Sequence, residues 1–323
     1  MNKQDLRIVF LGTPEFAAYS LEKILADGFN VVGVVTMPDK QAGRGHHMLQ
    51  SAVKETALKH NLQLLQPEKL KDPQFLEQLR SLQADIFVVI AFRMLPEAVW
   101  QMPPLGTFNL HASLLPAYRG AAPINWAVIN GETRTGVTTF FLKHEIDTGD
   151  IIAQQAIDIA PDENVGSVHD RLMHLGADLT IATLNNIIAG TLKTVPQNQL
   201  LNDGQQPTPA PKIFKETCRI NWNQPAADIY NLIRGLSPYP AAWTTLSDET
   251  LPEGGLQLKV FEAQLTDIPA TAPGNTSITA KGEMLIDCAD KAIALTQVQL
   301  QGRKRMKTDD FLRGAKLSNP KVS

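Results

Sequence analysis

The first 110 residues of this 323-residue chain alternate short apolar runs with amphipathic segments, and this alternation restricts the fold more than any other feature. Buried strands are predicted at residues 6–11, 31–36 and 86–91, with helical patterns between them. Strands that alternate with helices form parallel sheets covered on both faces. We therefore expect a Rossmann-like, doubly wound α/β sheet in the first part of the chain.

The elements around this sheet can also be placed from the sequence. Thr13 suits the N-cap of a first helix that ends near Gly28, and Pro14 suits its first helical position. Periodic apolar residues predict the remaining elements. The predicted helices are 51–60, 75–82 and 167–189, and the predicted strands are 62–65, 135–141 and 151–159. Residues 1–192 thus form one expected domain.

The turn after the first strand argues against a dinucleotide site. Gly12 is followed by Thr-Pro-Glu-Phe, so the second and third glycines of Gly-x-Gly-x-x-Gly are missing. In open sheets of this class, ligands bind beyond the carboxyl ends of the strands. Asn109, His111 and the segment after Ala91 meet that condition.

Asn109 and His111 stand at the end of a predicted strand and are two residues apart, so their side chains should face one cavity. An amide that donates to an oxyanion, beside an imidazole that handles a proton, suits carbonyl chemistry. Asp147, in an acidic loop downstream, would orient the imidazole and favour its protonated form. A lone histidine is more often structural, but the combination favours a catalytic site.

The composition changes after residue 192. Residues 193–211 are polar and rich in proline, as in a linker. Beyond them a helix is predicted at 226–235, with short strands at 241–246, 256–261, 284–288 and 293–300. This pattern predicts a small OB-like β-barrel domain over residues 212–323, a fold often used to bind nucleic acid.

Charge and cysteine content exclude several classes of protein. The net charge of −3 argues against a protein that coats nucleic acid indiscriminately, but residues 40–47 and 303–307 form local basic patches. Cys218 and Cys288 are too few for a disulfide framework or a thiolate metal site, and no metal is expected. We find neither a targeting segment nor an apolar run that could span a membrane, and we expect a cytoplasmic protein.

The chain resembles the folate-dependent formyltransferases. The resemblance is carried by Asn-x-His at 109–111, Ser-Leu-Leu-Pro at 113–116 and Asp-Thr-Gly at 147–149, in this order and spacing. It extends from about Arg7 to about Gly314. Within the family, the whole chain is similar to the branch that formylates methionine carried by initiator tRNA.

The resemblance implies transfer of the formyl group of 10-formyltetrahydrofolate to the α-amino group of methionyl initiator tRNA, without a metal or an obligate protein partner. It also implies roles for individual residues. The expected catalytic residues are Asn109, His111 and Asp147. The expected folate-binding residues are Ser113, Leu114, Leu115, Pro116, Phe92, Arg93, Met94 and Leu95. The expected tRNA-binding residues are Arg44, Lys40, Lys212, Lys215, Arg303, Lys304 and Arg305.

Three other functions share part of this pattern. A formyltransferase that acts on a small nucleotide or a sugar amine would keep the chemistry and change the acceptor. A catalytically silent RNA- or folate-binding protein would not need Asn109, His111 and Asp147 together. A formyl-folate hydrolase should carry a small regulatory domain at the other end in place of the C-terminal barrel.

Overall fold

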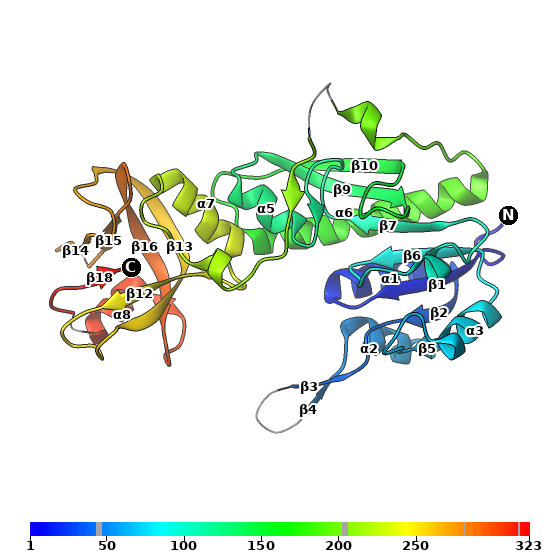
Figure 1. The fold of residues 1–323 in the computed structure, drawn as a ribbon, viewed down its shortest axis with the longest axis horizontal. Helices are drawn as coiled ribbons and strands as arrows, with labels where there is room; N and C mark the ends of the chain where they lie inside the picture. The colour runs from blue at the N-terminus through cyan, green and yellow to red at the C-terminus, as the bar shows by residue number, and fades with distance from the viewer. Residues whose placement is uncertain (43–46, 202–205, 281, 316) are drawn as a thin grey trace. The chain divides into compact units, whose positions relative to one another are not determined.

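A computed structural model describes residues 1–42, 47–201, 206–280, 282–315 and 317–323 (Figure 1). The chain forms two compact units. The first unit comprises Met1–Pro123, Thr135–Ile157 and Asp170–Ala210, and the second comprises Ile124–Arg134, Asp158–His169 and Pro211–Ser323. Each unit has its own sheet and its own buried core.

The first unit is built on a seven-stranded sheet with the order β10-β9-β7-β6-β1-β2-β5. Its strands are β1 (Arg7–Gly12), β2 (Asn30–Val35), β5 (Leu64–Leu65), β6 (Ile86–Ile90), β7 (Thr107–His111), β9 (Arg134–Phe141) and β10 (Ile151–Asp158). Strands β7, β6, β1, β2 and β5 are parallel, and β9 runs antiparallel to β7. The strand order reverses between β1 and β6, which is where folds of this class bind ligands.

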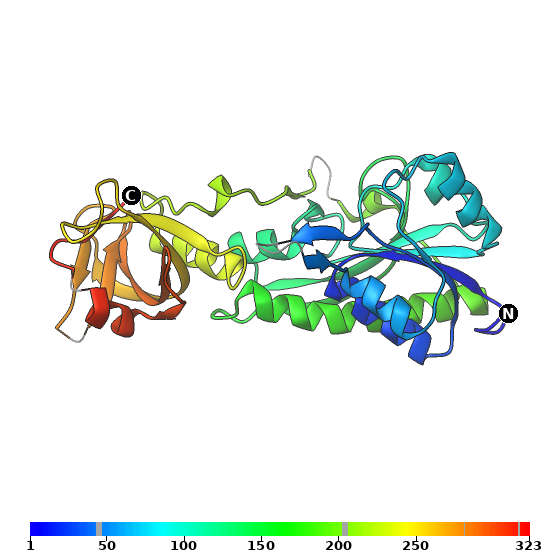
Figure 2. The same cartoon turned by 90° about the horizontal axis from the view of Figure 1, so that it is seen from below.

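Helices cover both faces of this sheet, as Figure 2 shows. They are α1 (Glu15–Ala26), α2 (Ala52–Lys59), α3 (Pro73–Ser81), α4 (Glu97–Trp100) and α6 (Val165–Ala189). Phe75 and Leu79 of α3 pack with Val9 and Val89 in one core cluster. Helix α6 passes so close to β7 that a Cβ at Gly176 would lie 2.7 Å from Leu110. The expected doubly wound α/β sheet is confirmed.

The prediction for the start of the first helix is wrong by one position. Helix α1 begins at Glu15, and Pro14 is its N-cap because the Pro14 carbonyl accepts hydrogen bonds from the N–H groups of Ala17 and Ala18. The Thr13 hydroxyl is buried and makes no hydrogen bond within the described residues.

Two small pairings were not expected from the sequence. Strands β3 (Lys40–Ala42) and β4 (His47–Leu49) pair antiparallel at the ends of the basic patch of residues 40–47. Strands β8 (Arg119–Gly120) and β11 (Pro209–Ala210) pair in parallel. The second pairing joins the polar stretch after residue 193 to the segment that follows β7.

The second unit contains an antiparallel sheet wrapped around one apolar core. The sheet order is β14-β15-β16-β13-β12-β18, and β17 pairs with β16. Its strands are β12 (Ala242–Ser247), β13 (Leu256–Pro269), β14 (Thr276–Ile278), β15 (Met284–Asp287), β16 (Lys291–Leu300), β17 (Met306–Lys307) and β18 (Lys321–Val322). A bridge between Asn275 and Lys321 joins the two ends of this order, so the sheet nearly closes into a barrel. The expected OB-like barrel is confirmed as this near-closed sheet.

Helices α5 (Pro123–Ile129), α7 (Ala226–Leu236) and α8 (Thr308–Ala315) accompany the sheet of the second unit, with short 3-10 turns at Gln197–Leu200 in the first unit and Glu216–Cys218 in the second. The apolar face of α7 packs Ile229 and Ile233 into the barrel core. A Cβ at Gly235 would lie 2.5 Å from Ile129, so α5 and α7 approach each other closely.

Cys218 and Cys288 are both buried and unpaired, and burial raises the pKa of the Cys288 thiol to about 12. The described residues contain no cluster of three or more His, Cys, Asp or Glu side chains arranged to hold a metal ion. No helix within them is both long enough and apolar enough to cross a bilayer.

Candidate active site

Strand β7 carries the two side chains that the sequence analysis expects on one face. Asn109 lies between Val89 of β6 and Phe140 of β9, and His111 lies opposite Thr138. Residues two apart in a strand project to the same face, so both side chains start from one face at the carboxyl end of β7. His111 is buried, whereas Asn109 remains partly exposed. The amide is therefore the more accessible of the two groups.

Both ring nitrogens of His111 face an oxygen. Nε2 lies 2.8 Å from the Tyr118 carbonyl, and because a carbonyl can only accept, Nε2 carries the proton. Nδ1 lies 3.9 Å from Oδ2 of Asp147, a distance for an ion pair rather than a direct hydrogen bond. Phe140 packs against the imidazole edge to face, with the ring centres 6.5 Å apart. The imidazolium form would place its second N–H toward the carboxylate.

The carboxylate of Asp147 is held from a second direction. Its Oδ2 accepts a hydrogen bond of 3.0 Å from the backbone N–H of Gly120. Asp147 has a φ of 53°, a left-handed conformation that aspartate tolerates better than most residues. The loop between β9 and β10 is thus bent so that this side chain reaches His111.

The bend requires a glycine at position 149, two residues after Asp147. A Cβ placed there would lie 1.5 Å from the carbonyl oxygen of Phe141, far inside contact distance. The N–H of Phe141 also donates to the carbonyl of Asp150 at 3.1 Å. The two ends of the loop therefore touch through their backbones.

The Ser-Leu-Leu-Pro segment shapes the turn between His111 and Tyr118. Ser113 is fully buried, and its hydroxyl donates to the carbonyl of Ala117 at 2.6 Å. The N–H of Leu115 donates to the Thr138 hydroxyl, and that hydroxyl donates to the Ser113 carbonyl. Leu115 packs into a small core with Phe140, whereas Leu114 and Pro116 are half-buried. Ser113 and Leu115 hold the turn, and Leu114 and Pro116 are the members with exposed surface.

In the segment after β6, too, some side chains support the fold and another is exposed. The guanidinium of Arg93 donates to the carbonyls of Pro67 and Glu68, and burial lowers its pKa. Leu95 is buried in the core and Phe92 packs against the same cluster, but Met94 is 75% exposed. The segment therefore presents an apolar side chain, not a charge, at the carboxyl end of β6.

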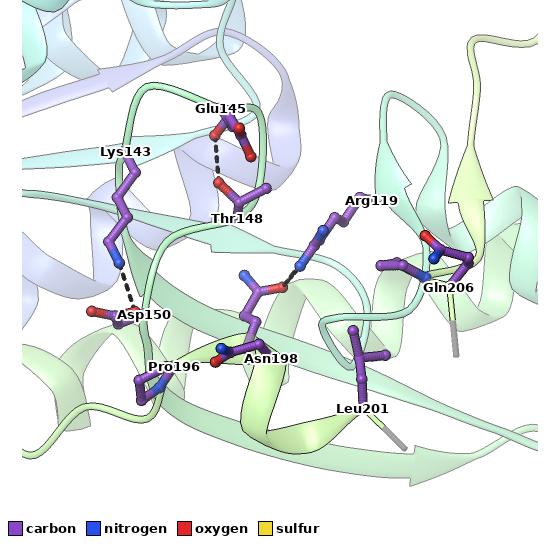
Figure 3. Close-up of a pocket in the computed structure, with 11 residues that line it drawn as sticks. Arg119, Lys143, Glu145, Thr148, Asp150, Pro196, Asn198, Leu201 and Gln206 are labelled. Atoms are coloured by element: carbon purple, nitrogen blue, oxygen red, sulfur yellow. Dashed lines mark hydrogen bonds and ion pairs between the residues drawn. The ribbon is translucent and has the colours of Figure 1, made fainter. Parts of the chain in front are cut away.

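Gln197 and Arg119 also belong to this region, although no motif in the sequence predicts a role for them. Gln197 is only 3% exposed, and its amide oxygen accepts two hydrogen bonds from the Arg119 guanidinium. Both residues line a cavity of about 530 Å³, in which Figure 3 shows Arg119 beside the loop that carries Lys143, Glu145 and Thr148. Gln197 sits in a polar run with no apolar periodicity, so nothing in the sequence signals its burial.

Comparison with known proteins shows to which family the chain belongs. Residues 6–184 match the formyl transferase domain, and residues 212–316 match the formyl transferase C-terminal domain. The chain belongs to the formyl transferase family. The chain is 56% identical over 320 residues to a protein of Bacteroides fragilis named methionyl-tRNA formyltransferase, covering 98% of each sequence. A protein of the same name from Flavobacterium johnsoniae is 50% identical, again with 98% of both sequences covered.

Solved structures show the same fold at low identity. The sugar 3N-formyl transferase WlaRD, crystallised with dTDP and 5-N-formyl-THF, matches this formyltransferase with a TM-score of 0.64 at 18% identity. The match covers 93% of this chain and 99% of that one. An N-formyltransferase from Helicobacter canadensis matches with a TM-score of 0.62 at 20% identity, covering 90% and 98%.

The residues expected to bind tRNA are scattered in this formyltransferase, and not all can be placed. Arg44 lies outside the described residues. Lys40 begins β3, and only its backbone is described. In the second unit, the Lys212 ammonium lies 5.6 Å from the centre of the Phe214 ring, and the Lys215 ammonium lies 5.6 Å from the centre of the Trp243 ring.

The remaining basic residues lie at the end of β16. Arg303 and Lys304 are exposed in the turn that follows this strand. Arg305 stacks on Phe261, with its guanidinium carbon 4.3 Å from the ring centre, and forms an ion pair of 3.3 Å with Glu262. Arg303 and Lys304 are therefore the more accessible pair.

Replacing Gly149 by alanine should disrupt the Asp147 loop, because the new Cβ would displace the Phe141 carbonyl. We expect a loss of unfolding free energy of about 2 kcal/mol or more, with loss of activity. Thermal unfolding and a formyl transfer assay measure both effects. Gly314→Ala is the control, since its Cβ would meet nothing within 4 Å and alanine favours the helix there. A Gly149→Ala protein with unchanged Tm and activity would contradict the prediction.

Proposed function

We propose that this chain transfers the formyl group of 10-formyltetrahydrofolate to the α-amino group of methionyl initiator tRNA in the cytoplasm, and so makes N-formylmethionyl-tRNA for translation initiation. The observation that carries the proposal is the identity of 56% over 98% of both sequences with a methionyl-tRNA formyltransferase. The match includes the C-terminal domain, residues 212–316, as well as the catalytic one. The acceptor is assigned from this full-length similarity.

Asn109 and His111 supply the stabilisation that this reaction needs. Attack of an amine on the formyl carbon places negative charge on the formyl oxygen, and preorganised N–H donors lower the energy of that charge. The partly exposed Asn109 amide donates one hydrogen bond to this oxygen. The His111 imidazolium adds positive charge from the same face of β7.

Asp147 orients the His111 ring and stabilises its positive charge. Its carboxylate faces Nδ1 of His111 at 3.9 Å, an ion-pair distance. The carboxylate stabilises the positive ring. It relays the proton that the attacking amine loses to the folate nitrogen, which leaves as its bond to the formyl carbon breaks. The Tyr118 carbonyl fixes the opposite nitrogen, so the ring cannot turn away.

The folate co-substrate supplies the activated formyl group. The reversal of strand order between β1 and β6 supports a folate site at the carboxyl ends of these strands, where folds of this class bind ligands. The segment after β6 fits a flat heteroaromatic ring, because Met94 offers an exposed apolar surface while Arg93 is turned to Pro67 and Glu68. Leu114 and Pro116 complete the apolar wall, and Ser113, Leu115, Phe92 and Leu95 hold the two segments in place.

The second unit holds the tRNA through phosphate contacts, assisted by Lys40 and Arg44 from the first. Arg303 and Lys304 provide exposed charge on one turn, and Lys212, Lys215 and Arg305 lie over aromatic rings. Cation–ring stacking leaves the charge at the surface while ordering the side chain, which suits phosphate binding.

The acceptor is tested by offering the enzyme and 10-formyltetrahydrofolate three amines in parallel: methionyl initiator tRNA, glycinamide ribonucleotide and a dTDP-amino sugar. We expect product with the charged tRNA alone, because the chain is similar to methionyl-tRNA formyltransferases along its full length. Formylation of a small amine without the tRNA product would replace the proposed acceptor. Uncharged initiator tRNA is the control for the amine.

Single Asn109→Ala and His111→Ala variants should each lower kcat by about 10²–10³, the usual cost of one oxyanion donor. His60→Ala is the matched control, because His60 pairs with Glu22 on the surface and lies outside the site. Circular dichroism and thermal unfolding check that each variant is folded. A loss below tenfold in both variants would remove Asn109 and His111 from the proposed mechanism.

The double variant Arg303→Gln, Lys304→Gln should weaken tRNA binding and leave kcat at saturating tRNA unchanged. Two lost phosphate contacts should reduce the slope of log Kd against log salt by about 1.5. Filter binding at several salt concentrations measures this slope. Arg313→Gln is the control, because Arg313 is paired with Asp309 and Asp310 on α8. An unchanged slope would exclude this turn from the interface.

A further inference from the structure

The side chain of Gln197 uses its whole hydrogen-bonding capacity inside the protein. Its Nε2 donates to the carbonyls of Asp147 and Gly149, each at 2.8 Å. Its Oε1 accepts from Nε and a terminal nitrogen of Arg119, at 3.1 and 2.7 Å. A glutamine amide offers two donors and two acceptor positions, and here all four are occupied. The side chain is 3% exposed, and it has no hydrogen-bonding position left for a substrate.

The two carbonyls that Gln197 binds lie in the strained part of the Asp147 loop. Asp147 adopts a left-handed backbone conformation, which is unfavourable and persists only where neighbours hold it. The Nε2 donors hold the carbonyls of Asp147 and Gly149, on either side of Thr148. Gln197 therefore fixes the direction in which the Asp147 carboxylate leaves the backbone.

The acceptor side of the same amide reaches the other loop of the site. Arg119 stands between Tyr118, whose carbonyl binds Nε2 of His111, and Gly120, whose N–H binds the Asp147 carboxylate. Burial lowers the pKa of Arg119, and the negative charges of Asp147 and Glu145 oppose that shift. Gln197 thus connects the segment that orients His111 to the loop that carries Asp147.

We propose that Gln197 is a positioning residue, which holds Asp147 and the Tyr118–Gly120 segment in register around His111. The proposal adds a residue outside the catalytic motifs to the function proposed above, and rests on that function only for the kinetic part of its test. A loss of the clamp lets Asp147 turn away from Nδ1 of His111. Misplacement by about 1 Å at a reacting group can cost about 100-fold in rate.

Two variants separate the clamp from simple packing. Gln197→Met keeps the shape and removes all four hydrogen bonds. Gln197→Glu keeps the acceptor for Arg119 but turns a carboxylate oxygen toward the carbonyls of Asp147 and Gly149, which repel it. At lower pH a protonated glutamic acid regains one O–H donor. We expect kcat to fall about 10–100-fold in both variants at unchanged KM, with partial recovery of Gln197→Glu alone as pH falls.

A second readout does not depend on activity. In protein labelled with ¹⁵N-histidine, the ring nitrogen shifts of His111, assigned with His111→Asn, report the carboxylate that faces Nδ1. We expect these shifts to change in Gln197→Met. The control is Thr183→Val, which loses a buried hydrogen bond of 2.8 Å to Thr139 of β9. Thr139 is paired with Leu110 and so lies on the face of the sheet opposite to that of His111, and the variant should leave kcat and the His111 shifts unchanged.

The outcomes distinguish the two proposals. Wild-type kcat and unchanged His111 shifts in both Gln197 variants would overturn the positioning role. Changed His111 ring nitrogen shifts in the Gln197 variants of an enzyme that does not formylate methionyl-tRNA would support the role and overturn the proposed acceptor. If Gln197→Met fails to fold, Arg119→Leu removes the partner on the acceptor side of the same amide and allows the same two measurements.

Discussion

The hydrogen bond from the N–H of Gly120 to the Asp147 carboxylate joins two loops of the site directly. One loop follows β7 and returns through Tyr118, whose carbonyl binds His111, and the other connects β9 to β10. The imidazole lies between them, with one nitrogen toward each. Both polar contacts of the ring depend on these loops remaining together, whereas the sheet supplies the position of β7 and the Phe140 ring that packs against the imidazole.

Much of the first unit follows from its sequence, because each buried strand is a short apolar run and each helix has an apolar face. The predicted strand at 86–91 is β6 to within one residue, and the predicted helix at 167–189 is α6 to within two. The wrong or missing predictions concern hydrogen bonds between backbone groups. Threonine is a common N-cap residue, so Thr13 is a reasonable prediction. The Pro14 carbonyl nevertheless accepts the first hydrogen bonds of helix α1. The pairing of β8 with β11 joins residues 119–120 to 209–210, and no local pattern encodes it.

The sequence likewise predicts some residues of the candidate site and misses others. Asn109, His111 and Asp147 are polar residues in apolar or turn-forming surroundings, so their spacing can be read directly. Within the motifs, the sequence cannot separate side chains that support a loop from side chains with exposed surface. The side chains of Ser113 and Arg93 donate hydrogen bonds to nearby backbone carbonyls, whereas the Met94 side chain is exposed. Gln197 was read as part of a polar connector, because a buried glutamine with satisfied hydrogen bonds leaves no periodic signal.

The polar stretch after residue 193 is bound to the loop after β7 at two places. Besides Gln197, the carbonyl of Thr208 accepts from the N–H of Tyr118, and the carbonyl of Ala210 accepts from Ala121. A Cβ at Gly120 would lie 2.4 Å from that Ala210 carbonyl. These contacts bear on where the protein can be divided. A catalytic fragment cut at residue 192 would leave the carbonyls of Asp147 and Gly149 without donors, and one that extends through Ala210 would keep them.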